Sequence, residues 1–313
     1  MTERLFDEAF LRRLERLALV ARRASAGQTQ GERRSPKRGQ SVEFSDFRPY
    51  TMGDDFRRID WNAYARLERF FIKLFVEEED LAVHLLVDTS QSMRWGTPDK
   101  LAYAVRVAGA LGYIALTGLD RVTVSAIGPG KPVAVNGGAG SSMYMPFLRG
   151  KRNALQLFDF LQHLQQPPVE VNGTAHDPGL ALRAYANTRT PSGANRPGSL
   201  VLLSDLMHDG WMEGLRALAS RGYEINVIHI LAPEEANPEM DGDLKLIDSE
   251  DNSEVEITAD YDLLSRYRQS VAAWQEELRA FCQARGIAYI PLDTSLPLED
   301  LLFAWLERQG VLR

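Results

Sequence analysis

The sequence predicts an α/β protein built on a doubly wound, mostly parallel sheet with helices on both faces. Short apolar runs alternate with longer amphipathic segments through most of the chain, which is the pattern of a parallel sheet covered by helices. The run 82–87 is almost entirely apolar, as expected for a strand buried on both faces. The chain has 313 residues, of which 44% are hydrophobic, so it can form one large domain or one domain with an appended segment.

The first part of the chain, residues 1–69, is predicted to be an N-terminal extension. Apolar side chains recur at helical spacing over 4–23, and a basic loop follows. Residues 40–62 mix aromatic and charged side chains in a pattern that indicates short strands and turns. Residues 1–40 contain ten basic and five acidic side chains, so the start of the extension is positively charged.

The sheet domain is predicted to fill residues 70–313. Its expected strands lie at 70–76, 82–87, 121–127, 131–135, 199–204, 224–231 and 287–291. Its expected helices lie at 98–117, 151–164, 177–188, 211–221, 261–285 and 298–308. The short strand 131–135 is expected to form an edge of the sheet.

An acidic insertion at about 232–260 interrupts this alternation. Two short apolar segments, 244–247 and 255–257, flank a polar turn and predict a β-hairpin. Residues 231–262 contain twelve acidic side chains and one basic side chain, whereas the whole chain has a net charge of −7. The net charge is therefore a cancellation between a basic extension and an acidic insertion, and both are candidate surfaces for partners.

The composition excludes several classes of protein. A single cysteine, Cys282, excludes an internal disulfide framework and a cysteine-based zinc site, and it agrees with a reducing compartment. The longest apolar run, 107–119, is shorter than the roughly 20 residues needed to span a bilayer. The net negative charge argues against a nucleic-acid binder. We expect a cytoplasmic protein without a transmembrane segment, with peripheral contact to a membrane through the basic loop 31–38 as the alternative.

Polar side chains follow two of the predicted strands at the place where ligands usually bind, beyond the carboxyl ends of a parallel sheet. Four of these side chains, together with Thr174, which lies before the helix predicted at 177–188, are expected to meet at one edge: Asp88, Ser90, Ser92, Thr174 and Asp205. Oxygen ligands that include two carboxylates suit Mg²⁺ or Mn²⁺. In the alternative interpretation, Asp88 and the two serines only cap the turns that follow the strand.

This set resembles the metal-ion-dependent adhesion site (MIDAS) of von Willebrand factor A (vWA) domains. The segment that starts at Asp88 matches its Asp-x-Ser-x-Ser motif, and Thr174 and Asp205 match the Thr and Asp of two later loops. The resemblance implies a vWA-like fold in which Ser90, Ser92 and Thr174 contact the metal directly, while the two aspartates act through water. It also implies that a partner protein supplies a carboxylate to the remaining coordination position.

The segment before this site resembles the signature of the DUF58 family. The matching residues are Glu43-Phe44, Arg48-Pro49-Tyr50, Gly53-Asp54-Asp55, Arg57-Arg58-Ile59-Asp60-Trp61, Ala65-Arg66, Asp120-Arg121-Val122 and Arg149-Gly150-Lys151-Arg152-Asn153. The resemblance covers roughly residues 30–300. It implies a vWA-like domain with an N-terminal extension, often encoded beside a MoxR-type AAA+ ATPase and without established enzymatic activity.

Charged and aromatic residues of this signature form a candidate partner-binding surface: Arg48, Asp54, Asp55, Arg57, Arg58, Asp60 and Trp61. In the alternative interpretation, these charges make internal ion pairs that hold the extension to the sheet domain.

The sequence therefore favours a metal-ion-dependent protein-interaction module, an adaptor or co-chaperone that works with a MoxR-type AAA+ ATPase and is not an enzyme. A first alternative is a Mg²⁺-dependent phosphohydrolase that uses Asp88 as its nucleophile. Such enzymes usually carry a second Asp two residues later, where this chain has Ser90. A second alternative is a structural self-assembly protein with a vestigial metal site.

Overall fold

In a computed structural model, the chain folds into two compact units. The smaller unit comprises residues 31–80, and the larger one comprises residues 1–30 and 81–313. The structure describes residues 5–15, 42–51, 56, 59–77, 82–128, 144–166, 178–188, 198–208, 210–248 and 253–302. The predicted division is 1–69 and 70–313; in the structure, residues 1–30 belong to the larger unit and the strand predicted at 70–76 belongs to the smaller one.

The smaller unit is a two-stranded antiparallel sheet with a short helix between its strands. β1 (Val42–Pro49) pairs with β2 (Phe71–Glu77), and α2 (Trp61–Leu67) lies between them in the chain. The Asp60 carboxylate begins α2 by accepting hydrogen bonds from the amides of Asn62 and Ala63, at 2.9 and 3.2 Å. Within the described part of this region, β1 confirms a strand where short strands and turns are predicted.

The larger unit is built on a six-stranded sheet in the order β10-β7-β6-β3-β4-β5. Its strands are β3 (Ala82–Asp88), β4 (Arg121–Ile127), β5 (Tyr144–Arg149), β6 (Ser199–Ser204), β7 (Glu224–Leu231) and β10 (Ala288–Asp293). Only β5 is antiparallel to its neighbour. Every residue of β3 is buried, as its apolar run predicts. The sheet confirms the predicted doubly wound, vWA-like α/β fold.

The edge strand β5 is the main addition to the predicted list of strands. The strand predicted at 131–135 lies outside the described residues, and the structure places 144–149 beside β4. Pro146 falls where the register between the two strands shifts, which is a position that tolerates a residue without an amide hydrogen. Because proline inside a short segment argues against a strand, the sequence pattern did not indicate β5.

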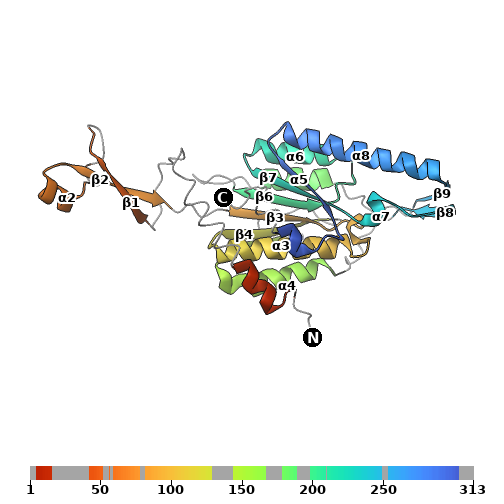
Figure 1. The fold of residues 1–313 in the computed structure, drawn as a ribbon, viewed down its shortest axis with the longest axis horizontal. Coiled ribbons are helices and arrows are strands. Elements are labelled where there is room, and N and C mark those ends of the chain that lie inside the picture. The colour runs from red at the N-terminus through yellow and green to blue at the C-terminus, as the bar shows by residue number, and fades with distance from the viewer. Residues whose placement is uncertain are drawn as a thin grey trace. The chain divides into compact units, whose positions relative to one another are not determined.

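Helices cover both faces of the sheet (Figure 1). The helices α3 (Lys100–Thr117) and α4 (Ala154–Leu164) lie on one face, and α5 (Pro178–Thr188), α6 (Trp211–Ser220) and α8 (Tyr261–Gln283) lie on the other. Successive side chains of a strand point to opposite faces. Leu85 of β3 accordingly packs in the core beneath α3 and α4, while Leu86 packs in the core beneath α5, α6 and α8.

Both described ends of the chain pack on the face that carries α3 and α4. Residues 8–15 are helical, within the helix predicted at 4–23, and Phe6 lies with its ring centre 5.4 Å from that of Phe158. Residues 298–302 begin the helix predicted at 298–308, and Leu301 is buried in the same core. Within the part of the chain that the structure describes, no helix combines the length and the apolar character needed to cross a bilayer.

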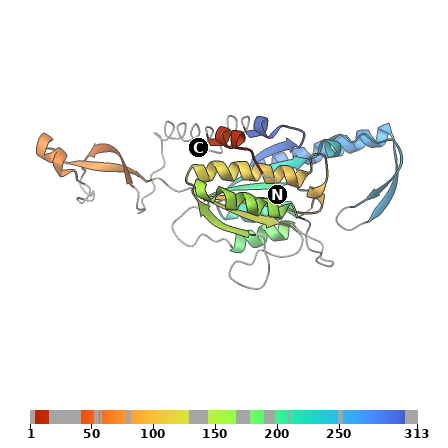
Figure 2. The same ribbon diagram turned by 90° about the horizontal axis from the view of Figure 1, so that it is seen from below.

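The acidic insertion forms the predicted β-hairpin. After the short helix α7 (Pro233–Ala236), β8 (Gly242–Ile247) pairs in antiparallel register with β9 (Glu254–Ala259). Figure 2 shows the hairpin extending away from the sheet at the end where α8 begins. Leu246 lies directly opposite Val255, and these side chains are 43% and 58% exposed. The hairpin therefore presents an apolar side to its surroundings.

Candidate metal site

Four of the five predicted ligand residues meet at the carboxyl ends of two neighbouring strands. Asp88 is the last residue of β3, and Ser90 and Ser92 follow in the next turn. Asp205 comes directly after β6, which pairs in parallel with β3. Parallel neighbours bring their carboxyl ends to the same edge, so the topology places these side chains together. The fifth predicted ligand, Thr174, lies outside the described residues.

These four side chains line one small pocket of about 50 Å³. The other residues that line it are Pro178, Met207 and His208. The loop after β6 packs directly on the start of α5, since a Cβ on Gly179 would lie 2.0 Å from the carbonyl oxygen of Gly210. This close approach of two backbones brings the start of α5 and the loop after β6 to the pocket. His208 is part of the lining of the pocket.

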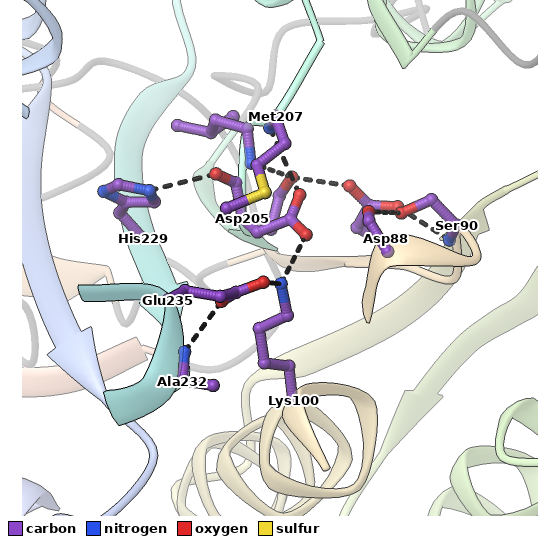
Figure 3. Close-up of polar contacts among 11 residues, drawn as sticks. Asp88, Ser90, Lys100, Asp205, Met207, His229, Ala232 and Glu235 are labelled. Carbon is purple, nitrogen blue, oxygen red and sulfur yellow. Dashed lines mark hydrogen bonds and ion pairs between the residues drawn. The ribbon is translucent and has the colours of Figure 1, made fainter. Parts of the chain in front are cut away.

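Asp88 is buried, and both of its carboxylate oxygens accept hydrogen bonds (Figure 3). The amide of Ser90 donates to Oδ1 at 2.9 Å, and the hydroxyl of Ser204 donates to Oδ2 at 2.5 Å. Burial and the nearby charge of Asp205 raise the pKa of Asp88 to about 7. Groups from β6 and from the turn after β3 therefore fix the orientation of this carboxylate.

The spacing of the two serine hydroxyls fits a small divalent cation. Oγ of Ser90 and Oγ of Ser92 lie 3.0 Å apart and share a hydrogen bond. Two adjacent oxygen ligands of an octahedral Mg²⁺, each about 2.1 Å from the ion, are separated by about 3.0 Å. Among the described residues, no group of three or more His, Cys, Asp or Glu side chains is arranged to hold a metal.

A buried lysine that the sequence patterns do not single out contacts one of these aspartates. Nζ of Lys100 donates to Oδ2 of Asp205 at 2.8 Å and to Oε1 of Glu235 at 2.5 Å (Figure 3). Burial raises the pKa of Glu235. A signal for the lysine exists in the sequence, because Lys100 and Arg106 are the two charged residues in the otherwise apolar helix α3.

His229 supports the backbone behind the pocket. Its Nε2 lies 3.0 Å from the carbonyl oxygen of Asp205, and its Nδ1 lies 2.6 Å from the hydroxyl of Tyr289. Burial lowers the pKa of His229 to about 4, so the imidazole is neutral at pH 7. The histidine lies in the buried strand β7 and holds the chain where β6 ends.

The structure describes part of the predicted partner-binding surface. Arg48 pairs through its backbone with Ile72 across β1 and β2. Asp60 is 7% exposed and is occupied as the N-cap of α2, so it does not present a free carboxylate. Trp61 is 61% exposed and lies 6.2 Å from Tyr64 between ring centres. The remaining members lie outside the described residues: Asp54, Asp55, Arg57 and Arg58.

Together, the sheet and the pocket define an α/β protein of vWA-like topology with a polar pocket at the carboxyl edge of its central strands. The chain belongs to the DUF58 family, because the family described as "Protein of unknown function DUF58" matches residues 46–277. The expectation drawn from the signature residues is thereby confirmed for the family.

The chain is also similar, at low sequence identity, to curated relatives and to solved structures. The uncharacterized proteins Rv1480 of Mycobacterium tuberculosis and Mb1516 of Mycobacterium bovis are each 27% identical over 304 residues, which is 96% of this chain and 90% of the relative. BatB from Bacteroides thetaiotaomicron is 17% identical with a TM-score of 0.40, and it covers 73% of this chain and 98% of its own. An aerotolerance-related membrane protein from Bacteroides fragilis is 16% identical with a TM-score of 0.42, covering 72% and 97%.

Proposed function

We propose that this protein is a metal-ion-dependent protein-interaction module in which Mg²⁺ or Mn²⁺ in the pocket binds an acidic side chain of a partner. The observation that carries the proposal is the meeting of Asp88, Ser90, Ser92 and Asp205 in one pocket, with the serine hydroxyls 3.0 Å apart. Both aspartates already accept hydrogen bonds from protein groups. A cation held largely by neutral hydroxyls retains positive charge, and a carboxylate from outside is its natural complement.

The proposed partner is a MoxR-type AAA+ ATPase, with this chain as its adaptor or co-chaperone. This part of the proposal rests on the DUF58 signature, since such an ATPase is often encoded beside members of the family. By the same resemblance, Thr174 would complete the ligand set formed by Ser90 and Ser92. The exposed ring of Trp61 in the smaller unit offers a second contact for the partner.

Metal binding tests the first part of this proposal. We expect the purified protein to bind Mn²⁺, measured by the loss of the free-ion signal in electron paramagnetic resonance. Asp88→Ala and Ser90→Ala are each expected to weaken binding about tenfold or more, because each removes an oxygen of the pocket. Ser220→Ala, at an exposed serine of α6, is the matched control and should leave the affinity unchanged.

Partner binding tests the second part. A purified MoxR-type ATPase from the same genome is expected to bind the protein in Mg²⁺, to be released by EDTA, and to bind Asp88→Ala poorly. Equal binding in Mg²⁺ and in EDTA would contradict a metal-dependent interaction.

The geometry supports an interaction module over a hydrolase that uses Asp88. A nucleophilic carboxylate needs an oxygen that can reach the substrate. Asp88 is 2% exposed, and each of its two oxygens already accepts a hydrogen bond, one from the amide of Ser90 and one from Ser204, so little of the carboxylate is open to a substrate. Mg²⁺-dependent phosphatase turnover that disappears in Asp88→Asn would reverse this ranking.

A further inference from the structure

Lys100 places a positive charge where its own helix disfavours one. It is the first residue of α3, and the positive end of the helix dipole repels a cation at that position. Its side chain is 0% exposed, so the ammonium group has lost its water. The compensation comes from Asp205 at 2.8 Å and Glu235 at 2.5 Å. The lysine is therefore held by the charges around the pocket and not by its helix.

The two carboxylates that hold Lys100 belong to different segments, and each is anchored by a second hydrogen bond. Oδ1 of Asp205 accepts from the amide of Met207 at 3.2 Å. Oε2 of Glu235 accepts from the amide of Ala232 at 2.9 Å. Lys100 bonds the other oxygen of each, as Figure 3 shows. It thus bridges the pocket to α7, the segment that leads into the β8–β9 hairpin.

We propose that Lys100 is the internal counter-cation of the pocket, which competes with a divalent ion for the charge of Asp205 and is retained by Glu235 when the ion binds. This inference rests on the proposed function, because it concerns the metal in the same pocket. An ammonium bonded to Asp205 lowers the negative charge that a metal meets and repels the metal directly. The free protein then binds the metal weakly, and the carboxylate of a partner supplies the missing negative charge.

Two substitutions in this one cluster should change the Mn²⁺ affinity in opposite directions. Lys100→Met removes the competing charge and is expected to tighten Mn²⁺ binding about tenfold or more. Glu235→Gln leaves the ammonium to Asp205 alone and is expected to weaken binding about tenfold. A purely structural role for the cluster would weaken binding in both variants. Titration of the full-length protein with Mn²⁺, followed by electron paramagnetic resonance at low ionic strength, measures both affinities.

The hairpin provides a matched control, an exposed pair of the same chemistry. Lys245 and Glu254 lie 2.6 Å apart. Lys245→Met and Glu254→Gln are expected to leave the Mn²⁺ affinity within about twofold, because water screens exposed charges. If Lys100→Met does not fold, the double variant Lys100→Met/Glu235→Gln removes the cation together with one of its carboxylates. Tighter Mn²⁺ binding in the double variant than in Glu235→Gln then supports the same role.

The remaining outcomes support or overturn the counter-cation role, the metal site, or both. If wild type binds Mn²⁺ and the Lys100 and Glu235 variants do not shift its affinity in opposite directions, the counter-cation role is overturned and the metal site stands. If Mn²⁺ binds only after Lys100→Met, the competition is supported in its strongest form. If neither wild type nor any variant binds Mn²⁺, the proposed function and this inference both fail.

Discussion

Two pairs of lysine and carboxylate in this chain have similar geometry and opposite environments. Lys100 and Asp205 lie 2.8 Å apart with side chains 0% and 2% exposed, whereas Lys245 and Glu254 lie 2.6 Å apart with side chains 51% and 52% exposed. When one partner of the exposed pair is removed, water solvates the other, but a buried charge has no such replacement. The distance between two charges therefore says little about their energetic weight until their burial is known.

The same contrast separates the pocket from the β8–β9 hairpin as a whole. Around the pocket, buried polar groups satisfy one another, as Ser204 does for Asp88 and His229 does for the carbonyl of Asp205. In the hairpin, apolar side chains such as Leu246 are exposed. Burying polar groups costs free energy unless each has a partner, so the groups around the pocket depend on one another in a way that the exposed side chains of the hairpin do not.

The largest expected effect is the difference in stability lost when the lysine of each ion pair is replaced. Lys100→Met should lower the free energy of unfolding by about 3–5 kcal/mol, because it leaves two carboxylates without their shared cation in a buried place. Lys245→Met should lower it by less than about 1 kcal/mol. Urea denaturation at pH 7, followed by circular dichroism, measures both values. Equal losses would show that burial does not distinguish these pairs.

A smaller effect on the free energy of unfolding is expected where a hydroxyl group, and not a lysine, donates the hydrogen bond to the carboxylate. Ser204 donates to Asp88 in the interior, and Thr258 donates to Asp243 on the hairpin at 2.7 Å. Ser204→Ala should cost about 1–3 kcal/mol of stability, because the buried carboxylate loses a donor. Thr258→Val should cost less than about 0.5 kcal/mol. The same denaturation assay tests the pair, and a larger loss for the threonine variant would reverse the contrast.

The strands that are buried on both sides were predictable in position and length. The segments 121–127, 199–204 and 224–231 match the observed bounds of β4, β6 and β7, since each is a short run rich in Val, Ile or Leu that is bounded by turn residues. The edge strand β5 was not predictable in this way, because it pairs on one side and contains Pro146 at its register shift.

Some contacts of the pocket were likewise predictable from the order of the strands, whereas others depend on tertiary packing. Asp88 and Asp205 were predictable as neighbours because each follows a strand, and parallel strands end at one edge. The contacts of Lys100 were not, because Asp205 and Glu235 lie 105 and 135 positions away from it in the chain. They depend on how the first turn of α3 packs against the end of β6 and against α7.

The smallest effect is expected on the apolar side of the hairpin. Leu246 and Val255 face each other but are largely exposed, and a two-stranded hairpin has few other contacts to lose. Leu246→Ser should therefore change the free energy of unfolding by less than about 0.5 kcal/mol, measured by urea denaturation. A loss above about 1 kcal/mol would show that another part of the chain, or a second copy, covers this side in solution. The side chains of the hairpin would then be buried as those around the pocket are, and the two regions would differ in what buries them.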